Sequence, residues 1–106
     1  QMSNQGNLLD DSYLERTVKM ARSNNKDIIG FICQRKIADN NFLYMIPGVN
    51  LNESRDNSDQ RYITPFEAMD RGADIIIVGR GIIGKSNILE ECKKYQSSGW
   101  NNYKKY

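Results

Sequence analysis

The stretch Ala73-Asp74-Ile75-Ile76-Ile77-Val78-Gly79-Arg80-Gly81 decides the fold class. Residues 73–78 read as a strand that is apolar on both faces, which is typical of a parallel sheet covered by helices. Two glycines around an arginine follow at once, so the chain is able to turn sharply where the strand ends. We therefore predict a strand at residues 73–78 within an α/β fold.

Shorter apolar runs upstream also have the character of strands. They lie at residues 28–33 and 42–46, and Pro47-Gly48 stops the second. The helices predicted around them cover residues 12–23, 64 to about 72, and 86–103. The order of these elements is that of an α/β fold. A complete eight-stranded barrel needs about 250 residues, so the 106 residues are predicted to supply roughly the last three βα units plus the helix before them.

Two of the predicted helices begin with capping signals. Ser12 and Glu15 have the spacing of a capping box, and so do Thr64 and Glu67, with Pro65 at the first helical position. The last helix presents one predicted packing stripe, made of Leu89, Cys92, Tyr95 (or Gln96) and Trp100. Trp100 and Tyr103 are accordingly interpreted as packing residues and not as a ligand platform.

Composition narrows the range of functions. The chain has no histidine, which removes the commonest metal ligand and the commonest general base. Zinc hydrolase and Ser-His chemistry are therefore not expected within it. The formal net charge is only +2 and the lysines are dispersed, so nucleic acid is not an expected partner. Cys33 and Cys92 lie in apolar-periodic segments, and we interpret them as buried, reduced thiols of a cytosolic protein.

Neither a membrane span nor a secretion signal is predicted. The longest apolar run, residues 75–78, is far shorter than the roughly 20 residues that cross a bilayer. No basic-then-apolar leader opens the chain. Because the sequence begins at Gln1 rather than at a methionine, we expect it to have been cut from a longer chain.

Two segments that follow predicted strands favour an anion site. Residues 47–62 and 79–81 come after the last two strands, where barrels of this kind commonly bind phosphate. Glycines let the backbone approach an anion with its N–H groups pointing outward. Arg80 adds a permanent charge and a planar set of donors that matches phosphate oxygens. The alternative interpretation is a tight turn with a solvated arginine.

Residues 73–82 closely resemble the last barrel strand and phosphate loop of the orotidine 5'-phosphate decarboxylase family, most of all the eukaryotic form found in UMP synthases. Further segments resemble this family in its order and spacing. They are residues 2–8 (MSNQGNL), 30–34 (GFICQ), 47–49 (PGV), 60–62 (QRY) and 100–103 (WNNY). The resemblance covers nearly the whole chain. It implies that residues 1–106 are the C-terminal half of a TIM (β/α)8 barrel.

The resemblance also implies which residues bind the phosphate of the substrate. Arg80 would hold it, together with the backbone N–H groups of Gly79 and Arg80. Gln60 would bridge from the phosphate toward the pyrimidine, and Tyr62 would donate its hydroxyl to the phosphate.

Part of the pyrimidine site is implied as well. Pro47 would line the base pocket. Asn4 stands where the family usually has a serine that hydrogen-bonds the pyrimidine edge; an amide also donates and accepts, and Ser3 is a neighbouring candidate. Asp59 and Arg61 differ from the commoner Gly and Gln of the phosphate lid.

The catalytic motif of the family is missing. The family decarboxylates without a metal or an organic cofactor, through a lysine–aspartate array that includes an Asp-x-Lys-x-x-Asp motif after the third strand. Residues 34–39 (QRKIAD) place Lys36 and Asp39 at that spacing, but Gln34 replaces the first aspartate and the segment follows the sixth-strand signature. We interpret Lys36 and Asp39 as a solvated loop pair. The resemblance thus implies that no catalytic residue lies in this chain.

The function implied is conversion of orotidine 5'-phosphate to UMP and CO2 in pyrimidine synthesis, by a cytoplasmic, homodimeric parent enzyme, with this chain inactive on its own. One alternative is a non-catalytic half-barrel that only binds a partner, because three strands leave exposed sheet edges. The other is a different phosphate-binding barrel enzyme, such as a phosphosugar isomerase or epimerase. That class would share the glycine-rich turn but not the segments at 47–49 and 60–62.

Overall fold

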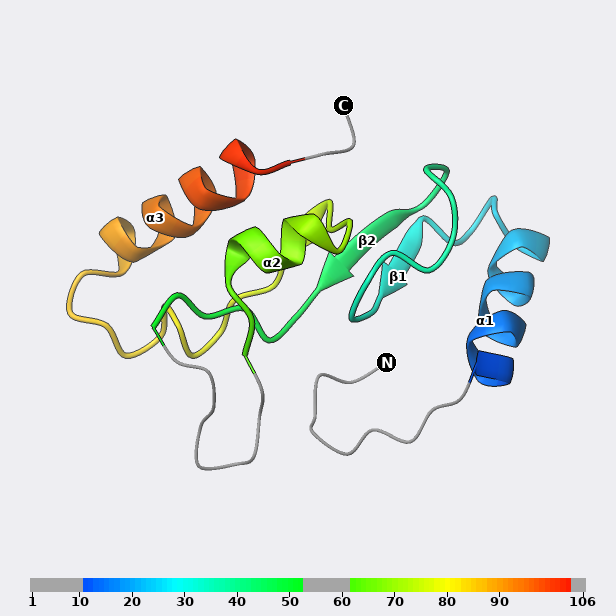
Figure 1. Cartoon of the computed structure of the whole chain (residues 1–106), viewed down its shortest axis with the longest axis horizontal. Coiled ribbons are helices and arrows are strands. Elements are labelled where there is room, and N and C mark those ends of the chain that lie inside the picture. The colour runs from blue at the N-terminus through cyan, green and yellow to red at the C-terminus, as the bar shows by residue number, and fades with distance from the viewer. Residues whose placement is uncertain (1–10, 53–61, 104–106) are drawn as a thin grey trace.

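The computed structural model describes residues 11–52 and 62–103, which form three helices and three strands (Figure 1). In chain order these are α1 (Asp11–Ser23), β1 (Gly30–Ile32), β2 (Leu43–Ile46), α2 (Pro65–Asp70), β3 (Ile75–Ile76) and α3 (Ile88–Asn101). The predicted elements are all present in the predicted order, and each strand is shorter than its apolar run.

The three strands form one parallel sheet in the order β1-β2-β3. Phe31 pairs with Tyr44, and Ile46 pairs with Ile76. Only two residues of β3 have regular strand geometry, although residues 73–78 were predicted as a strand. Backbone hydrogen bonds nevertheless extend this pairing, because the Asp74 N–H donates to the Tyr44 carbonyl at 2.8 Å and the Ile77 N–H to the Ile46 carbonyl at 2.9 Å.

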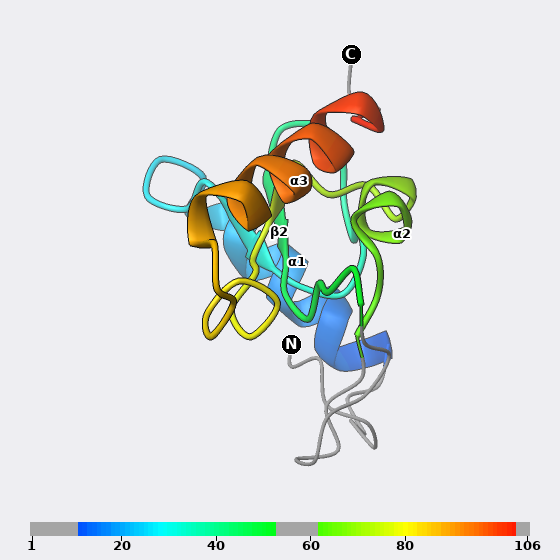
Figure 2. The same cartoon turned by 90° about the vertical axis from the view of Figure 1, so that its left-hand side faces the viewer.

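The helices pack on one face of the sheet and make two apolar clusters. At one end, α1 covers β1 and β2, and at the other α2 and α3 cover β2 and β3 (Figures 1 and 2). The first cluster contains Val18, Ala21, Phe31, Cys33, Phe42 and Tyr44. The second contains Ile46, Val49, Ala68, Met69, Ala73 and Tyr95. Both clusters use the strand residues that face the helices, as expected for a parallel sheet.

The opposite face of the sheet is apolar and exposed. Its side chains come from the alternate strand positions, and Ile32 and Ile75 are 57% and 44% exposed. Leu43 and Ile77 lie on the same face and are also exposed. Residues 73–78 are apolar on both faces, but helices of the described part of the chain cover only one of these faces. These three helices all lie on the covered side.

The structure confirms one capping signal and corrects the other. Thr64 caps α2, since its Oγ1 accepts a hydrogen bond from the Glu67 N–H at 3.1 Å, and Pro65 is the first helical residue. Ser12 lies inside α1, which begins at Asp11, so Ser12 is not the N-cap. Helix α3 begins after Asn87, whose side chain accepts from the Glu90 N–H at 3.1 Å.

The predicted packing stripe of α3 is correct only at Tyr95. That side chain is 3% exposed, whereas Leu89 and Trp100 are 64% and 74% exposed. The helix approaches its neighbours at Gly99, where an added Cβ would lie 3.6 Å from side-chain atoms of both Ile76 and Met69. This close approach turns the face with Tyr95 and Gly99 inward. Leu89, Cys92 and Trp100 are left exposed.

None of the described helices is long and apolar enough to cross a membrane.

Candidate functional site

The loops that follow β2 and β3 lie at the same edge of the sheet, because the two strands are parallel neighbours (Figure 1). Pro47 comes directly after β2, and Gly79-Arg80 follows the last residues that hydrogen-bond along β3. Tyr62 returns to this edge next to Ile63, which bridges to Val49. Four of the seven predicted site residues are thus brought to one edge. The other three, Ser3, Asn4 and Gln60, lie outside the described residues.

The base of the segment after β2 is held by backbone hydrogen bonds. The Asn50 N–H donates to the Ile63 carbonyl, and the Ile63 N–H donates to the Gly48 carbonyl, both at 2.9 Å. Gly48 has a φ of 72°, a conformation that favours glycine. Asn50 is 4% exposed, and its Oδ1 accepts from the Asn52 N–H at 2.9 Å. Residues 48–50 and Ile63 are therefore held together beside Pro47 and Tyr62.

The segment after β3 is a compact turn. The Gly79 carbonyl accepts from the N–H groups of Ile82 and Ile83, at 3.0 and 2.9 Å. With this helix-like bonding, the N–H groups of the first turn residues point away from the turn, as at a helix N-terminus. A Cβ added at Gly79 would meet nothing within 4 Å. Gly79 and Arg80 are both exposed, so the backbone of this turn is open to a ligand.

Gly81 differs from Gly79, because packing requires it to be a glycine. It is buried, and a Cβ at this position would lie 2.3 Å from the Tyr95 hydroxyl oxygen. The same hydroxyl accepts a hydrogen bond from the Leu51 N–H at 2.9 Å. Tyr95 therefore contacts both loops of the candidate site, although the sequence assigned it only to packing. The available signal was a tyrosine, with its polar end, at an apolar stripe position.

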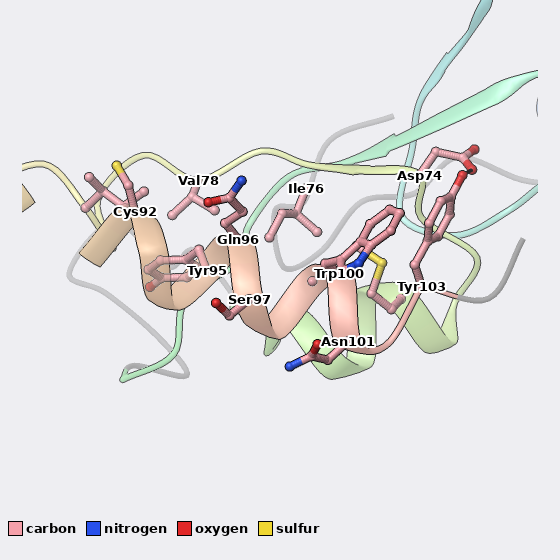
Figure 3. A pocket seen from close by; sticks show the side chains of 13 residues that line it. Asp74, Ile76, Val78, Cys92, Tyr95, Gln96, Ser97, Trp100, Asn101 and Tyr103 are labelled. Carbon is pink, nitrogen blue, oxygen red and sulfur yellow. Dashed lines mark hydrogen bonds between the residues drawn. The ribbon is translucent and has the colours of Figure 1, made fainter. Parts of the chain in front are cut away.

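One pocket lies next to the turn after β3, since Val78 and Ile82 are among the residues that line it. It has a volume of about 710 Å³ and lies between α3, α2 and β3 (Figure 3). None of the predicted site residues Pro47, Tyr62, Gly79 and Arg80 lines it. At one end the Tyr103 hydroxyl donates to Asp74 Oδ1 at 2.6 Å, and Asp74 Oδ2 accepts from the Tyr44 N–H at 2.9 Å. This hydrogen bond links the residues just after α3 to the residue just before β3.

Trp100 lines that pocket, and its exposure bears on the prediction that Trp100 and Tyr103 are packing residues. Its ring contacts the Tyr103 ring, with centroids 5.9 Å apart, but most of its surface is exposed. Tyr103 is half-buried, so the packing role is confirmed for Tyr103 and wrong for Trp100 within the described chain.

The loop after β1 has the arrangement of a solvated segment. Lys36 and Asp39 are both exposed, as predicted. They do not bind one another: Lys36 Nζ contacts Asn40 Oδ1, and Asp39 makes a 3.4 Å ion pair with Arg22. Within residues 11–52 and 62–103, no group of three side chains is placed to hold a metal ion.

The two cysteines have different environments. Cys33 is 1% exposed, and burial raises the pKa of its thiol. Burial also raises the pKa of Tyr44, its neighbour in the first apolar cluster. Cys92 is exposed, so the interpretation of two buried thiols is correct only for Cys33. Cys92 lies on a side of α3 that the described residues leave uncovered.

Parallel strands, helices packed on them and two loops at their shared carboxyl edge define an α/β protein with a candidate anion site. Residues 1–95 match the orotidine 5'-phosphate decarboxylase / HUMPS family, and the chain belongs to that family.

Three curated relatives show how much of a family member this chain represents. It is 44% identical to orotidine 5'-phosphate decarboxylase of Phycomyces blakesleeanus and 42% identical to that of Rhizomucor pusillus, over 97% of the chain in each case. Those matches span 40% and 41% of the two relatives. The chain is also 43% identical to uridine 5'-monophosphate synthase of Bos taurus, over 97% of the chain and 22% of that protein.

Proposed function

We propose that residues 1–106 form the C-terminal part of a TIM barrel in an enzyme that decarboxylates orotidine 5'-phosphate to UMP. The observation that carries this proposal is the open Gly79-Arg80 turn beside the loop after β2, in a chain of this family. The three parallel strands fit the last three strands of a barrel, with α1 before the first and with α2 and α3 after the second and the third. A different phosphate-binding barrel enzyme has no support beyond the turn itself.

In this proposal the turn after β3 binds the phosphate of the nucleotide. Arg80 supplies charge and donors, and the N–H groups of Gly79 and Arg80 add hydrogen bonds. The absence of a side chain at Gly79 gives the phosphate access to the backbone, since a Cβ there has open space around it. Tyr62 donates its hydroxyl from the neighbouring loop, and Gln60 bridges toward the pyrimidine.

The pyrimidine is bound by Pro47 and by Asn4 or Ser3. Pro47 is half-buried at the end of β2, on the same edge as the phosphate turn. The groups that remove CO2 lie in a different part of the parent enzyme, so the chain alone is inactive. Lys36 and Asp39 are excluded from that role in this proposal, because each is exposed and bound to a different partner.

Two further parts of the proposal concern the parent enzyme as a whole. It acts in the cytoplasm as a homodimer, without metal or organic cofactor. Both cysteines of the chain are free thiols, and free thiols are typical of a reducing compartment.

A chimeric enzyme tests the proposed activity. Residues 1–106 replace the matching C-terminal part of the Phycomyces decarboxylase, and the chimera is expressed in a microbial host that lacks this activity. We expect growth without uracil and CO2 release from orotidine 5'-phosphate. Arg80→Ala should lower kcat/KM at least about tenfold, because a hydrogen bond to a charged group contributes about 1.5–3 kcal/mol.

Lys36→Ala is the matched control, since it also removes one exposed cation and should keep full activity. A chimera that unfolds cooperatively but releases no CO2 would contradict the proposed function. That result would favour the alternative, a half-barrel that only binds a partner. The exposed apolar face of its sheet is the observation that supports this second candidate.

A further inference from the structure

We infer that Tyr95 is a positioning residue, which holds the two proposed phosphate-binding loops in register with each other through its hydroxyl group. This inference rests on the proposed function, because it concerns the geometry of the phosphate site. Tyr95 itself does not touch the substrate. It acts through Leu51 on one loop and through Gly81 on the other.

The contact with the first loop is a hydrogen bond. The Leu51 N–H donates to the Tyr95 hydroxyl oxygen at 2.9 Å. Leu51 lies two residues after Val49, which bridges to Ile63, the neighbour of Tyr62 in the chain. Tyr95 is 3% exposed, so the bond is shielded from water. An N–H without this acceptor would be left unsatisfied at a part-buried position, which is costly.

The contact with the second loop is steric. Gly81 is buried against the same hydroxyl, and a Cβ there would lie 2.3 Å from the oxygen and 3.1 Å from Cζ of the tyrosine ring. Gly81 comes directly after Arg80, so the position of the hydroxyl limits where the Arg80 backbone lies. One oxygen atom therefore defines the separation of two loops that are 30 residues apart in sequence, at Leu51 and Gly81.

Tyr103, two residues beyond the end of α3, provides an internal comparison. Figure 3 shows Tyr95 within α3 and Tyr103 beyond the end of the helix, directed at Asp74. Each hydroxyl makes one hydrogen bond to a part-buried group. Only the Tyr95 hydroxyl contacts the loops at the carboxyl ends of β2 and β3. If both hydroxyls only stabilised the fold, removing either one would have the same effect on ligand binding.

The test measures the Kd of UMP and of uridine for the complete enzyme that carries these residues, by calorimetry. Tyr95→Phe removes the hydroxyl and keeps the ring in the core. We expect the Kd of UMP to rise roughly three- to tenfold, the effect of losing one hydrogen bond. The Kd of uridine, which lacks the phosphate, should not change. Tyr103→Phe should leave both values unchanged.

A double variant tests the steric contact. Gly81→Ala alone should weaken UMP binding, because its Cβ displaces the turn from the hydroxyl. Combining it with Tyr95→Phe removes the atom at 2.3 Å and leaves Cζ at 3.1 Å as the nearest. The double variant should therefore bind UMP more tightly than Gly81→Ala. Simple additivity of the two losses would overturn the inference.

The outcomes separate this inference from the proposed function. If Arg80→Ala weakens UMP binding and Tyr95→Phe does not, the phosphate site stands and the positioning role of Tyr95 is wrong. Equal losses for UMP and uridine in Tyr95→Phe would also overturn it, since they indicate general loosening of the fold. If even Arg80→Ala leaves UMP binding unchanged, the proposed phosphate site fails and the inference fails with it.

Discussion

At the scale of single residues, the two glycines that flank Arg80 have different tasks. Gly79 has open space around its missing side chain, and Gly81 is enclosed by Tyr95 and Val78. The sequence shows only a symmetrical Gly-Arg-Gly motif, so it does not distinguish them. The difference arises because α3 returns to the turn and places Tyr95 beside the second glycine. We therefore propose that the backbone of Gly79 contacts the ligand, whereas Gly81 is a glycine because of packing.

Substitution of each glycine by alanine separates these two tasks. Gly79→Ala should change the free energy of unfolding by less than about 1 kcal/mol, since the new methyl group meets no neighbour. It should nevertheless raise the Kd of UMP about tenfold or more, because the methyl group blocks a hydrogen bond to a charged phosphate. Calorimetry and urea unfolding of the chimeric enzyme measure both effects. Gly81→Ala should destabilise the fold, and a Gly79→Ala variant that binds UMP normally would count against a phosphate at this turn.

At the scale of elements, the sequence patterns identified each helix and strand but not the rotation of α3. Thr64, Pro65 and Glu67 predicted the start of α2 correctly, because a capping interaction is local in sequence. The packing face of α3 depends on the close approach at Gly99 to Met69 and Ile76, which belong to other elements. A residue without a side chain contributes nothing to an apolar stripe. The stripe was therefore predicted at Leu89, Cys92 and Trp100, which are exposed.

The cluster between α1, β1 and β2 predicts a loss of stability in alkali. Burial raises the pKa of Cys33 and of Tyr44 above their ordinary values of about 8.5 and 10. Below those values both states of the protein are protonated and the groups have no effect. Above them the unfolded chain loses protons first, so the free energy of unfolding falls as the pH rises toward the folded pKa values.

Urea unfolding of the chimera at a series of pH values from 7 to about 10.5 tests this prediction. Cys33→Ala should reduce the alkaline loss of stability, because the first of the two buried acids is gone. Cys92→Ala is the control, since it also removes one thiol but from an exposed position. Identical profiles for the two variants would show that the Cys33 thiol does not contribute.

At the scale of the whole molecule, the chain has a parallel sheet with helices on one face and exposed apolar side chains on the other. Large exposed apolar patches mark interaction surfaces or aggregation hazards. The chain spans about 40% of the length of the decarboxylases it matches. In the proposed barrel, the remaining strands and the side chains they contribute cover this face.

The 106-residue chain by itself should therefore self-associate. We expect its mean mass in light scattering to rise with concentration, because Ile32 and Ile75 lie exposed on the open sheet face. Ile32→Thr combined with Ile75→Thr should lower this association. Ile83→Thr is the control: Ile83 is 74% exposed but lies in the turn after Arg80, outside the sheet. A monomer that unfolds in one cooperative transition at every concentration would contradict the prediction.

The sequence by itself determined the order of the elements, the start of α2 and the family, because these depend on local signals or on motifs in a set order. It also predicted that Pro47, Tyr62, Gly79 and Arg80 belong together, and the parallel pairing of β2 and β3 brings their segments to one edge. Only the tertiary structure decided which face of α3 is buried and what Tyr95 contacts. Those features depend on distances between segments that are far apart in sequence, such as Leu51 and Tyr95. A single side chain's periodic position carries no information about such distances, because they are set by packing between elements.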